Sequence, residues 1–222
     1  MKPQQMLGRV ATPDGRDLVL YLRDGVFSIR VGGLELMSSR AHGSEEDMAD
    51  LVLAEVRRRE PAVLVGGLGM GYTLRAVLDK APESARVTVA EIFPAVVRWN
   101  RDELAHLAHE PLSDSRVTVE EADVATVISA NPRDFDAVLL DVDNGPAAFT
   151  RAGNRRLYGP QGLAEIRRCL RPRGVLGVWS ADPDLPFARR LTKAGFRVRT
   201  ETVSARHRTK GPKHTIFVAK KL

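Results

Sequence analysis

The chain has very little cysteine: Cys169 is the only one among 222 residues, so no disulfide can form within it. No apolar run is long enough to span a bilayer. Residues 1–6 lack the apolar core of a secretory signal. These absences predict a protein that works away from membranes, in a reducing cytoplasm. Cys169 itself follows a helix-like apolar repeat, which places it in the core.

Aromatic residues are also scarce, at 5% of the chain. The net charge is +6, which raises the question of an anionic partner. The basic tail at 197–221 lacks the aromatic interleaving of single-strand binders, and no helix-turn-helix or finger spacing is present. A nucleic-acid partner is therefore disfavoured, and the arginines are interpreted as exposed surface. No cluster of cysteine and histidine has metal-ligand spacing, so no metal site is expected.

A glycine-rich loop is the feature around which the rest is organised. The segment 62–72, Ala-Val-Leu-Val-Gly-Gly-Leu-Gly-Met-Gly-Tyr, runs from a short apolar strand into a loop and then into a helical pattern. In an open α/β sheet, such a loop lets a nucleotide-like ligand approach the backbone, because a Cβ would collide with it. Tight strand–helix packing is the alternative. The candidate binding glycines are Gly66, Gly67, Gly69 and Gly71.

Acidic residues follow the next two strands. Glu91 ends the strand at 87–91, at a spacing that suits hydrogen bonds from ribose hydroxyls. Asp123 follows the strand at 116–120, where it would meet an adenine amino group or serve as a helix N-cap. The neighbouring Ile92 and Val124 are expected to line the same nucleoside site. The loop has no basic residue, so a ligand without pyrophosphate is expected.

A pair of aspartates closes the buried strand at 135–141. The segment 141–146 reads Asp-Val-Asp-Asn-Gly-Pro. Asp141 and Asp143 can hold an ammonium group and accept its proton, which an amine must lose before it attacks. Asn144 is expected to join the substrate site. The alternative is an Asx-turn that only reverses the chain.

The remaining patterns indicate two parts. Residues 1–40 contain short β-like runs at 18–22, 26–31 and 34–37, separated by hairpin turns, and predict a small antiparallel meander. Residues 41–222 alternate strands and helices, which predicts a mostly parallel sheet covered on both faces. A helix beginning with Ser44 in a capping box should end near Pro61. Strands at 196–203 and 214–219 are joined too closely for a crossover, so they must be antiparallel.

These motifs resemble those of class I S-adenosylmethionine-dependent transferases, specifically the spermidine synthase-like family. The resemblance covers nearly the whole chain, including the glycine run, Glu91 and the small N-terminal β unit. It extends through the segments 121–123, 135–146, 157–158 and 170–175. It implies the class I methyltransferase fold, a Rossmann-like seven-stranded, mostly parallel sheet with an antiparallel C-terminal strand.

The resemblance also implies roles for individual residues. The counterpart of Glu91 holds the ribose, that of Asp123 the adenine, and that of Asp141 is the catalytic base. The cofactor would be S-adenosylmethionine or its decarboxylated form. His42 and Tyr158 are candidates for the acceptor site, with a solvated loop and core packing as their alternatives.

Two departures from the family pattern decide the expected reaction. Aminopropyltransferases carry an aspartate inside the glycine loop, where this chain has Leu68 and Met70. They also carry a Tyr-His-Glu group in the preceding helix, whereas the comparable stretch here, 41–45, has no tyrosine. We therefore expect methyl transfer to a small or cationic acceptor, with Asp141 and Asp143 as the catalytic residues that align and deprotonate it.

Aminopropyl transfer from the decarboxylated donor to an amine is the first alternative, and a cofactor- or RNA-binding protein without turnover is the second. The acceptor stays open. An exposed edge of the N-terminal sheet favours a homodimer.

Overall fold

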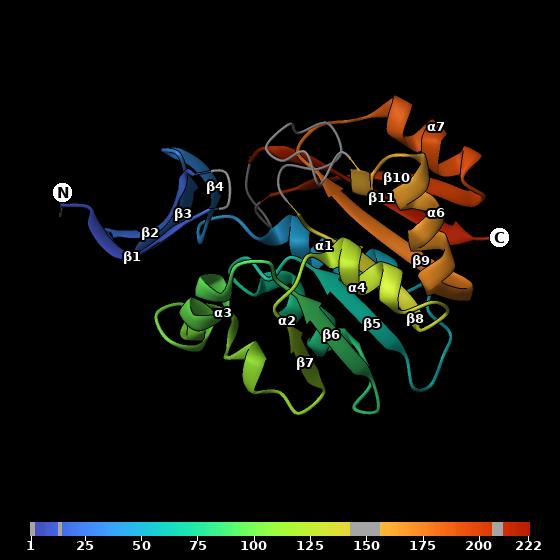
Figure 1. Cartoon of the computed structure of the whole chain (residues 1–222), viewed down its shortest axis with the longest axis horizontal. Coiled ribbons are helices and arrows are strands. Elements are labelled where there is room, and N and C mark those ends of the chain that lie inside the picture. Colours follow the sequence, from blue (N-terminus) through green and yellow to red (C-terminus); the bar gives the residue numbers. More distant parts are fainter. Residues whose placement is uncertain (1–2, 13–14, 143–155, 206–210) are drawn as a thin grey trace.

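The N-terminal part of the chain is a four-stranded antiparallel sheet with strands in sequential order (Figure 1). The computed structural model describes residues 3–12, 15–142, 156–205 and 211–222. The strands are β1 (Gln5–Ala11), β2 (Asp17–Arg23), β3 (Val26–Val31) and β4 (Leu34–Ser38). This confirms the expected meander and adds β1, whose mostly exposed sequence carries a glycine and no β-like apolar run.

The main sheet has seven strands in the order β10-β11-β9-β8-β5-β6-β7. Its strands are β5 (Ala62–Gly66), β6 (Arg86–Ala90), β7 (Val117–Glu120), β8 (Phe135–Leu140), β9 (Leu170–Ser180), β10 (Phe196–Ser204) and β11 (Lys213–Lys221). The adjacent strands β9, β8, β5, β6 and β7 are parallel to one another, and β11 runs antiparallel to both of its neighbours, β9 and β10. The predicted Rossmann-like fold is confirmed. The strand order reverses beside β5, where such sheets bind ligands.

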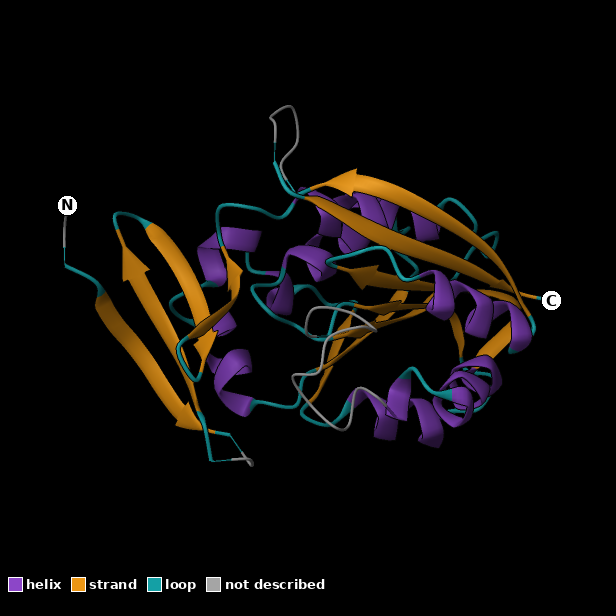
Figure 2. Ribbon diagram, turned by 90° about the horizontal axis from the view of Figure 1, so that it is seen from above, coloured by secondary structure: helices purple, strands orange, loops and turns teal. Residues whose placement is uncertain are grey.

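Helices cover both faces of this sheet, as Figure 2 shows. They are α1 (Gly43–Leu53), α2 (Tyr72–Lys80), α3 (Pro94–Arg101), α4 (Val124–Ala130), α6 (Pro160–Cys169) and α7 (Leu185–Lys193), with short 3-10 turns η1 (Ala105–Ala108) and η2 (Pro111–Ser113). Alternate residues of β5 face the two cores: Val63 and Val65 pack with α1, α2 and α3, while Ala62 and Leu64 pack with α4, α6 and α7. No helix in the described ranges is long and apolar enough to cross a membrane.

The N-terminal sheet shares the first of these cores. Leu18 and Leu20 of β2 and Phe27 and Ile29 of β3 are buried in the same cluster as Met48 of α1. Because these apolar side chains are buried against the main domain, the shared core stabilises the N-terminal sheet. The sheet therefore lies against the main domain at the end where α1, α2 and α3 pack.

Three element boundaries differ from the predicted ones. Helix α1 begins at Gly43, and Ser44 makes no capping bond. It ends at Leu53, well before Pro61, and the chain then turns so that Arg58 reaches Asp136 of β8. The apolar run 175–179 predicts a strand that begins at Val175, whereas β9 begins at Leu170, because Phe135 of β8 pairs with Leu170 before a register shift.

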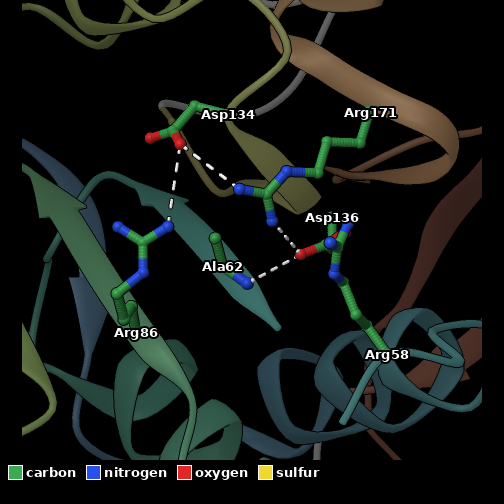
Figure 3. Close-up of polar contacts among 6 residues, drawn as sticks. All are labelled: Arg58, Ala62, Arg86, Asp134, Asp136 and Arg171. Atoms are coloured by element: carbon green, nitrogen blue, oxygen red, sulfur yellow. Dashed lines mark hydrogen bonds and ion pairs between the residues drawn. The ribbon is translucent and has the colours of Figure 1, made fainter. Parts of the chain in front are cut away.

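Charged residues form a network at the amino ends of the central strands (Figure 3). Asp136 of β8 is its centre: Arg171 Nη1 lies 2.6 Å from Asp136 Oδ2, which also accepts a 2.9 Å hydrogen bond from the Ala62 amide. The other members are Arg58, Arg86 and Asp134. The Asp136 side chain is only 10% exposed. This network links β5, β6, β8 and β9 at the edge opposite the glycine loop.

Candidate functional site

The glycine loop follows β5 and is shaped by backbone angles that only glycine adopts readily. Gly67, Gly69 and Gly71 have φ values of +87°, +54° and +83°. A Cβ on Gly67 would lie 2.6 Å from the carbonyl oxygen of Asp141, and one on Gly69 would lie 2.6 Å from Met37 Cε. Gly66 is packed between Leu140 and Val124. The loop is therefore compressed between β8 and the N-terminal sheet.

A cavity of about 460 Å³ opens above this loop. Its floor is formed by residues after the carboxyl ends of β5, β6, β7 and β8. The N-terminal sheet contributes Leu18, Ile29 and Met37 to its wall, and the C-terminal strands contribute Trp179 and His214. Gly67 and Gly69 line the cavity directly. The predicted location, beyond the strand ends at the reversal of strand order, coincides with this cavity.

Glu91 lies at the edge of the cavity and is 7% exposed. Its two carboxylate oxygens accept hydrogen bonds from the backbone amides of Leu68 (3.0 Å) and Phe93 (2.9 Å). Burial raises the pKa of this carboxyl, and the amide hydrogen bonds oppose the shift. Glu91 thus fixes the glycine loop, and its predicted role toward a ribose remains a proposal.

Asp123 is both a cavity residue and the N-cap of α4. Its Oδ1 accepts a 2.8 Å hydrogen bond from the Ala125 amide. The capping alternative is therefore correct, and contact with an adenine remains a proposal for the same side chain. Val124, which is buried, and Ile92, which is 36% exposed, flank it as apolar walls.

Asp141 follows β8 and faces the cavity. Thr73, at the start of α2, donates a 2.8 Å hydrogen bond from Oγ1 to Asp141 Oδ2. The backbone amide of Asp141 donates a 2.9 Å hydrogen bond to the Gly66 carbonyl, which holds Asp141 beside the glycine loop. Burial raises the pKa of Asp141 to about 6. A carboxylate with such a pKa is ionised at neutral pH and close to the range in which it can accept a proton.

Glu45, in the first turn of α1, also lines the cavity and was not among the predicted site residues. Burial, together with the charge of Asp141, raises the pKa of Glu45 to about 8. Two carboxyl groups that interact in this way hold one proton between them at neutral pH. The signal in the sequence was the stretch 41–45 itself, which corresponds in place to the amine-binding group of the family.

The structure does not bring His42 and Tyr158 to the cavity. The His42 ring stacks on Tyr72 with centroids 4.2 Å apart, and its Nδ1 lies 2.6 Å from Glu46 Oε1. Tyr158 is buried in the core on the other face, edge-on to Phe187. Asp143 and Asn144 lie outside the described residues, so their predicted roles are untested.

Ser44, Trp179 and His214 are further residues that the sequence did not point to. The position of Trp179 at the end of an apolar strand predicts a core residue. It does pack against the core, but it also lines the cavity, and its Nε1 donates a 3.0 Å hydrogen bond to Ser44 Oγ. His214 Nδ1 lies 2.9 Å from the same oxygen. These residues come from α1, β9 and β11, so no local motif could have grouped them.

The charge of the cavity wall is one-sided. Among the described residues that line it, five are acidic and none is lysine or arginine. The acids are Glu35, Glu45, Glu91, Asp123 and Asp141. Within the described ranges, no group of three or more histidine, cysteine, aspartate or glutamate residues could hold a metal ion. The wall therefore suits an organic cation.

Comparisons with known proteins identify the sequence family and the fold. A family model described as "Spermine/spermidine synthase domain" matches residues 41–186. The polyamine aminopropyltransferase 1 of Streptomyces coelicolor is 34% identical over 124 residues, which cover 54% of this chain and 22% of that protein. The polyamine aminopropyltransferase 2 of Ralstonia nicotianae is 25% identical over 203 residues, covering 87% and 38%. The chain thus spans less than half the length of these relatives.

A solved structure shares the fold. The crystal structure of spermidine synthase from Thermotoga maritima superimposes with a TM-score of 0.78 at 18% identity, covering 98% of this chain and 73% of that one. The match includes the N-terminal sheet, because it extends over almost the whole chain.

Proposed function

Because the chain belongs to the spermine/spermidine synthase domain family, we propose that it transfers an aminopropyl group from decarboxylated S-adenosylmethionine to an amine. The curated relatives described above are named polyamine aminopropyltransferases. They favour the reaction that sequence reasoning ranked second, and they give no support to the methyl transfer that it ranked first.

The observation that carries this proposal is the acidic cavity wall. S-adenosylmethionine bears a carboxylate, which needs a cation or a set of amide donors when it is buried. The described wall has five acids and no lysine or arginine. The decarboxylated donor has a sulfonium and an ammonium and no carboxylate, so every charge it brings is attracted by this wall.

The glycine loop explains why the missing loop acid does not exclude this donor. Leu68 and Met70, which stand in that loop, are 3% and 1% exposed and point into the core. Glu45 supplies a carboxyl to the same cavity from α1. We propose that Glu45 takes the place of the loop acid and that Gly67 and Gly69 cradle the nucleoside. Glu91 would meet the ribose and Asp123 the adenine.

Asp141 is the proposed base. The sulfonium already activates the carbon that is attacked, so the protein must bind, align and deprotonate the amine. An acceptor ammonium beside Asp141 would lose a proton to the carboxyl pair that Asp141 forms with Glu45, and the neutral amine would then attack. Met37 above Gly69 and the apolar side chains of the N-terminal sheet exclude water from that space.

Calorimetry with both donors tests the proposal, together with an assay for methylthioadenosine release in the presence of putrescine or spermidine. We expect the decarboxylated donor to bind at least about tenfold more tightly, a difference of about 1.4 kcal/mol. Glu45→Gln should remove most of that preference, whereas Glu46→Gln, next along the helix and paired with His42, should not. Tighter binding of S-adenosylmethionine with methyl transfer would overturn the proposal.

A further inference from the structure

The hydroxyl of Ser44 is the meeting point of three segments that are far apart in the sequence. Ser44 is fully buried. Its Oγ lies 2.7 Å from Glu45 Oε2, 2.9 Å from His214 Nδ1 and 3.0 Å from Trp179 Nε1. The rings of Trp179 and His214 pack edge to face, with centroids 4.5 Å apart. All four side chains are therefore held in fixed positions.

The hydrogen-bonding capacity of a hydroxyl restricts how this cluster can be protonated. A serine oxygen has one proton and two lone pairs. The indole of Trp179 can only donate, so it uses one lone pair. One proton and one lone pair then remain for Glu45 and His214.

Two arrangements satisfy this restriction. In the first, Glu45 is ionised and accepts from Ser44, and His214 donates from Nδ1–H. In the second, Glu45 is protonated and donates to Ser44, and Ser44 donates to an unprotonated Nδ1. The two arrangements differ by one proton, which moves between Glu45 and His214 through the hydroxyl.

We propose that Glu45, Ser44 and His214 form a proton relay that connects the amine site to solvent. The proposal rests on the proposed function, because transfer of an aminopropyl group to an ammonium releases one proton. Glu45 Oε2–H passes its proton to Ser44 Oγ while the Ser44 proton passes to His214 Nδ1. The imidazolium then releases a proton from Nε2 to solvent. One proton leaves the cavity, and no electrons change hands.

The charges around the two ends of the relay set its direction. Glu45 faces Asp141, and it is close enough to Glu46 and Tyr72 for their charges to interact. Asp182 is close enough to His214 for its charge to raise the pKa of the imidazole, against the effect of burial. Burial raises the pKa of Glu45 and lowers that of His214, so the proton resides on Glu45 before substrate enters. An incoming ammonium stabilises the Glu45 carboxylate, and Asp182 stabilises the imidazolium that forms.

The first test uses the substrate-free protein and does not depend on activity. Nitrogen-15 NMR of the histidine rings reports their tautomers and titrations, with the exposed His106 as an internal reference. We expect His214 to be neutral at pH 7 with Nδ1 unprotonated. Glu45→Gln should change the tautomer or the titration of His214. In a protein that already carries Ser44→Ala, adding Glu45→Gln should no longer change either. A His214 titration identical in the wild type and both variants would overturn the relay.

The second test measures turnover. His214→Ala should lower kcat about tenfold with KM changed by less than about twofold, and added imidazole should restore kcat. His106→Ala is the control, because His106 contacts Phe27 away from the cavity. It should leave kcat unchanged, and added imidazole should have no effect on it. A loss that appears in KM and is not rescued by imidazole would show a structural role and contradict the relay. Absence of aminopropyl transfer in the wild type would reject the proposed function, while the NMR result would still decide the relay.

Discussion

At the scale of single residues, Asp141 combines a buried carboxylate with a fixed position. The hydrogen bond from Thr73 and the backbone bond to Gly66 orient it toward the cavity. We predict that Asp141→Asn lowers kcat by at least about a hundredfold, because the amide cannot accept the amine proton. Donor affinity should stay within about tenfold of the wild type. Single-turnover kinetics and calorimetry measure the two quantities, and unchanged turnover would remove Asp141 from the mechanism.

Glu45 should leave a signature in the pH dependence of stability. Its folded pKa is about 8, compared with an ordinary value of 4.5. Below the ordinary value both states are protonated. As pH rises toward 8, the unfolded chain loses this proton while the folded chain keeps it, so the folded state is progressively destabilised.

Glu45→Gln removes this titration. Relative to the wild type, the variant should gain at least about 1 kcal/mol, or about 2–4 °C in Tm, between acidic and mildly alkaline pH. Thermal unfolding across this range measures the difference. Wild-type and variant curves that stay parallel would show that Glu45 is not buried in its protonated form.

At the scale of elements, the glycine loop can be tested against a turn of the same geometry. Gly67 and Gly33 have nearly equal φ values, +87° and +85°, but a Cβ at Gly33 would meet nothing within 4 Å. Gly33→Ala should therefore lower the free energy of unfolding by about 1 kcal/mol, the contribution of backbone strain alone. Gly67→Ala adds a collision with the Asp141 carbonyl and should abolish donor binding. Chemical denaturation and calorimetry compare the two variants, and equal effects would contradict a role for close packing at the loop.

The elements that were predicted correctly are those specified by local patterns. The apolar run of β5, the glycines after it and the acids Glu91, Asp123 and Asp141 lie within short segments, and parallel strands bring their carboxyl ends to one edge. These local patterns were enough to identify the sheet and the part of the cavity wall that follows the carboxyl ends of its strands. The end of α1 was mispredicted: the helix ends at Leu53, and the segment before Pro61 carries no local signal for that end.

The other half of the cavity depends on contacts that no local pattern contains. Ser44 and His214 are separated by 170 positions and meet only because α1 packs beside β9 and β11. Trp179 looked like a core residue because it ends an apolar strand, and only its position beside α1 directs it to the cavity. Tyr158 is the converse case, since α7 supplies Phe187 against its ring.

At the scale of the whole molecule, the ionic network of Figure 3 connects strands that belong to both halves of the sheet. Breaking a buried ion pair leaves the partner charge uncompensated. We predict that Asp136→Ala destabilises the protein by about 3–5 kcal/mol while kcat of the folded enzyme is unchanged. Asp17→Ala, which breaks an exposed pair with Arg9, should have no measurable effect. Denaturant titrations check both, and a similar small loss in both variants would show that the network adds little.

The two sheets also share the cavity. Because Leu18, Ile29 and Met37 line it, a division of the chain at residue 40 separates two parts of one cavity wall. The predicted division into residues 1–40 and 41–222 therefore remains a proposal about which parts of the chain fold as units. The expected homodimer also remains a prediction, with β1 and β4 as the edge strands that a partner could extend.

The acidic wall has a consequence for selectivity among adenosyl compounds. The chain carries a net charge of +6, so its outer surface attracts phosphorylated nucleotides such as ATP and NAD, which share the adenosine moiety. Along the described part of the cavity wall the sign is reversed, and each phosphate would face carboxylates with no lysine or arginine beside them. Under the proposed function, the wall would discriminate by charge between ligands that share a nucleoside, so we expect abundant cellular nucleotides to compete poorly with the decarboxylated donor.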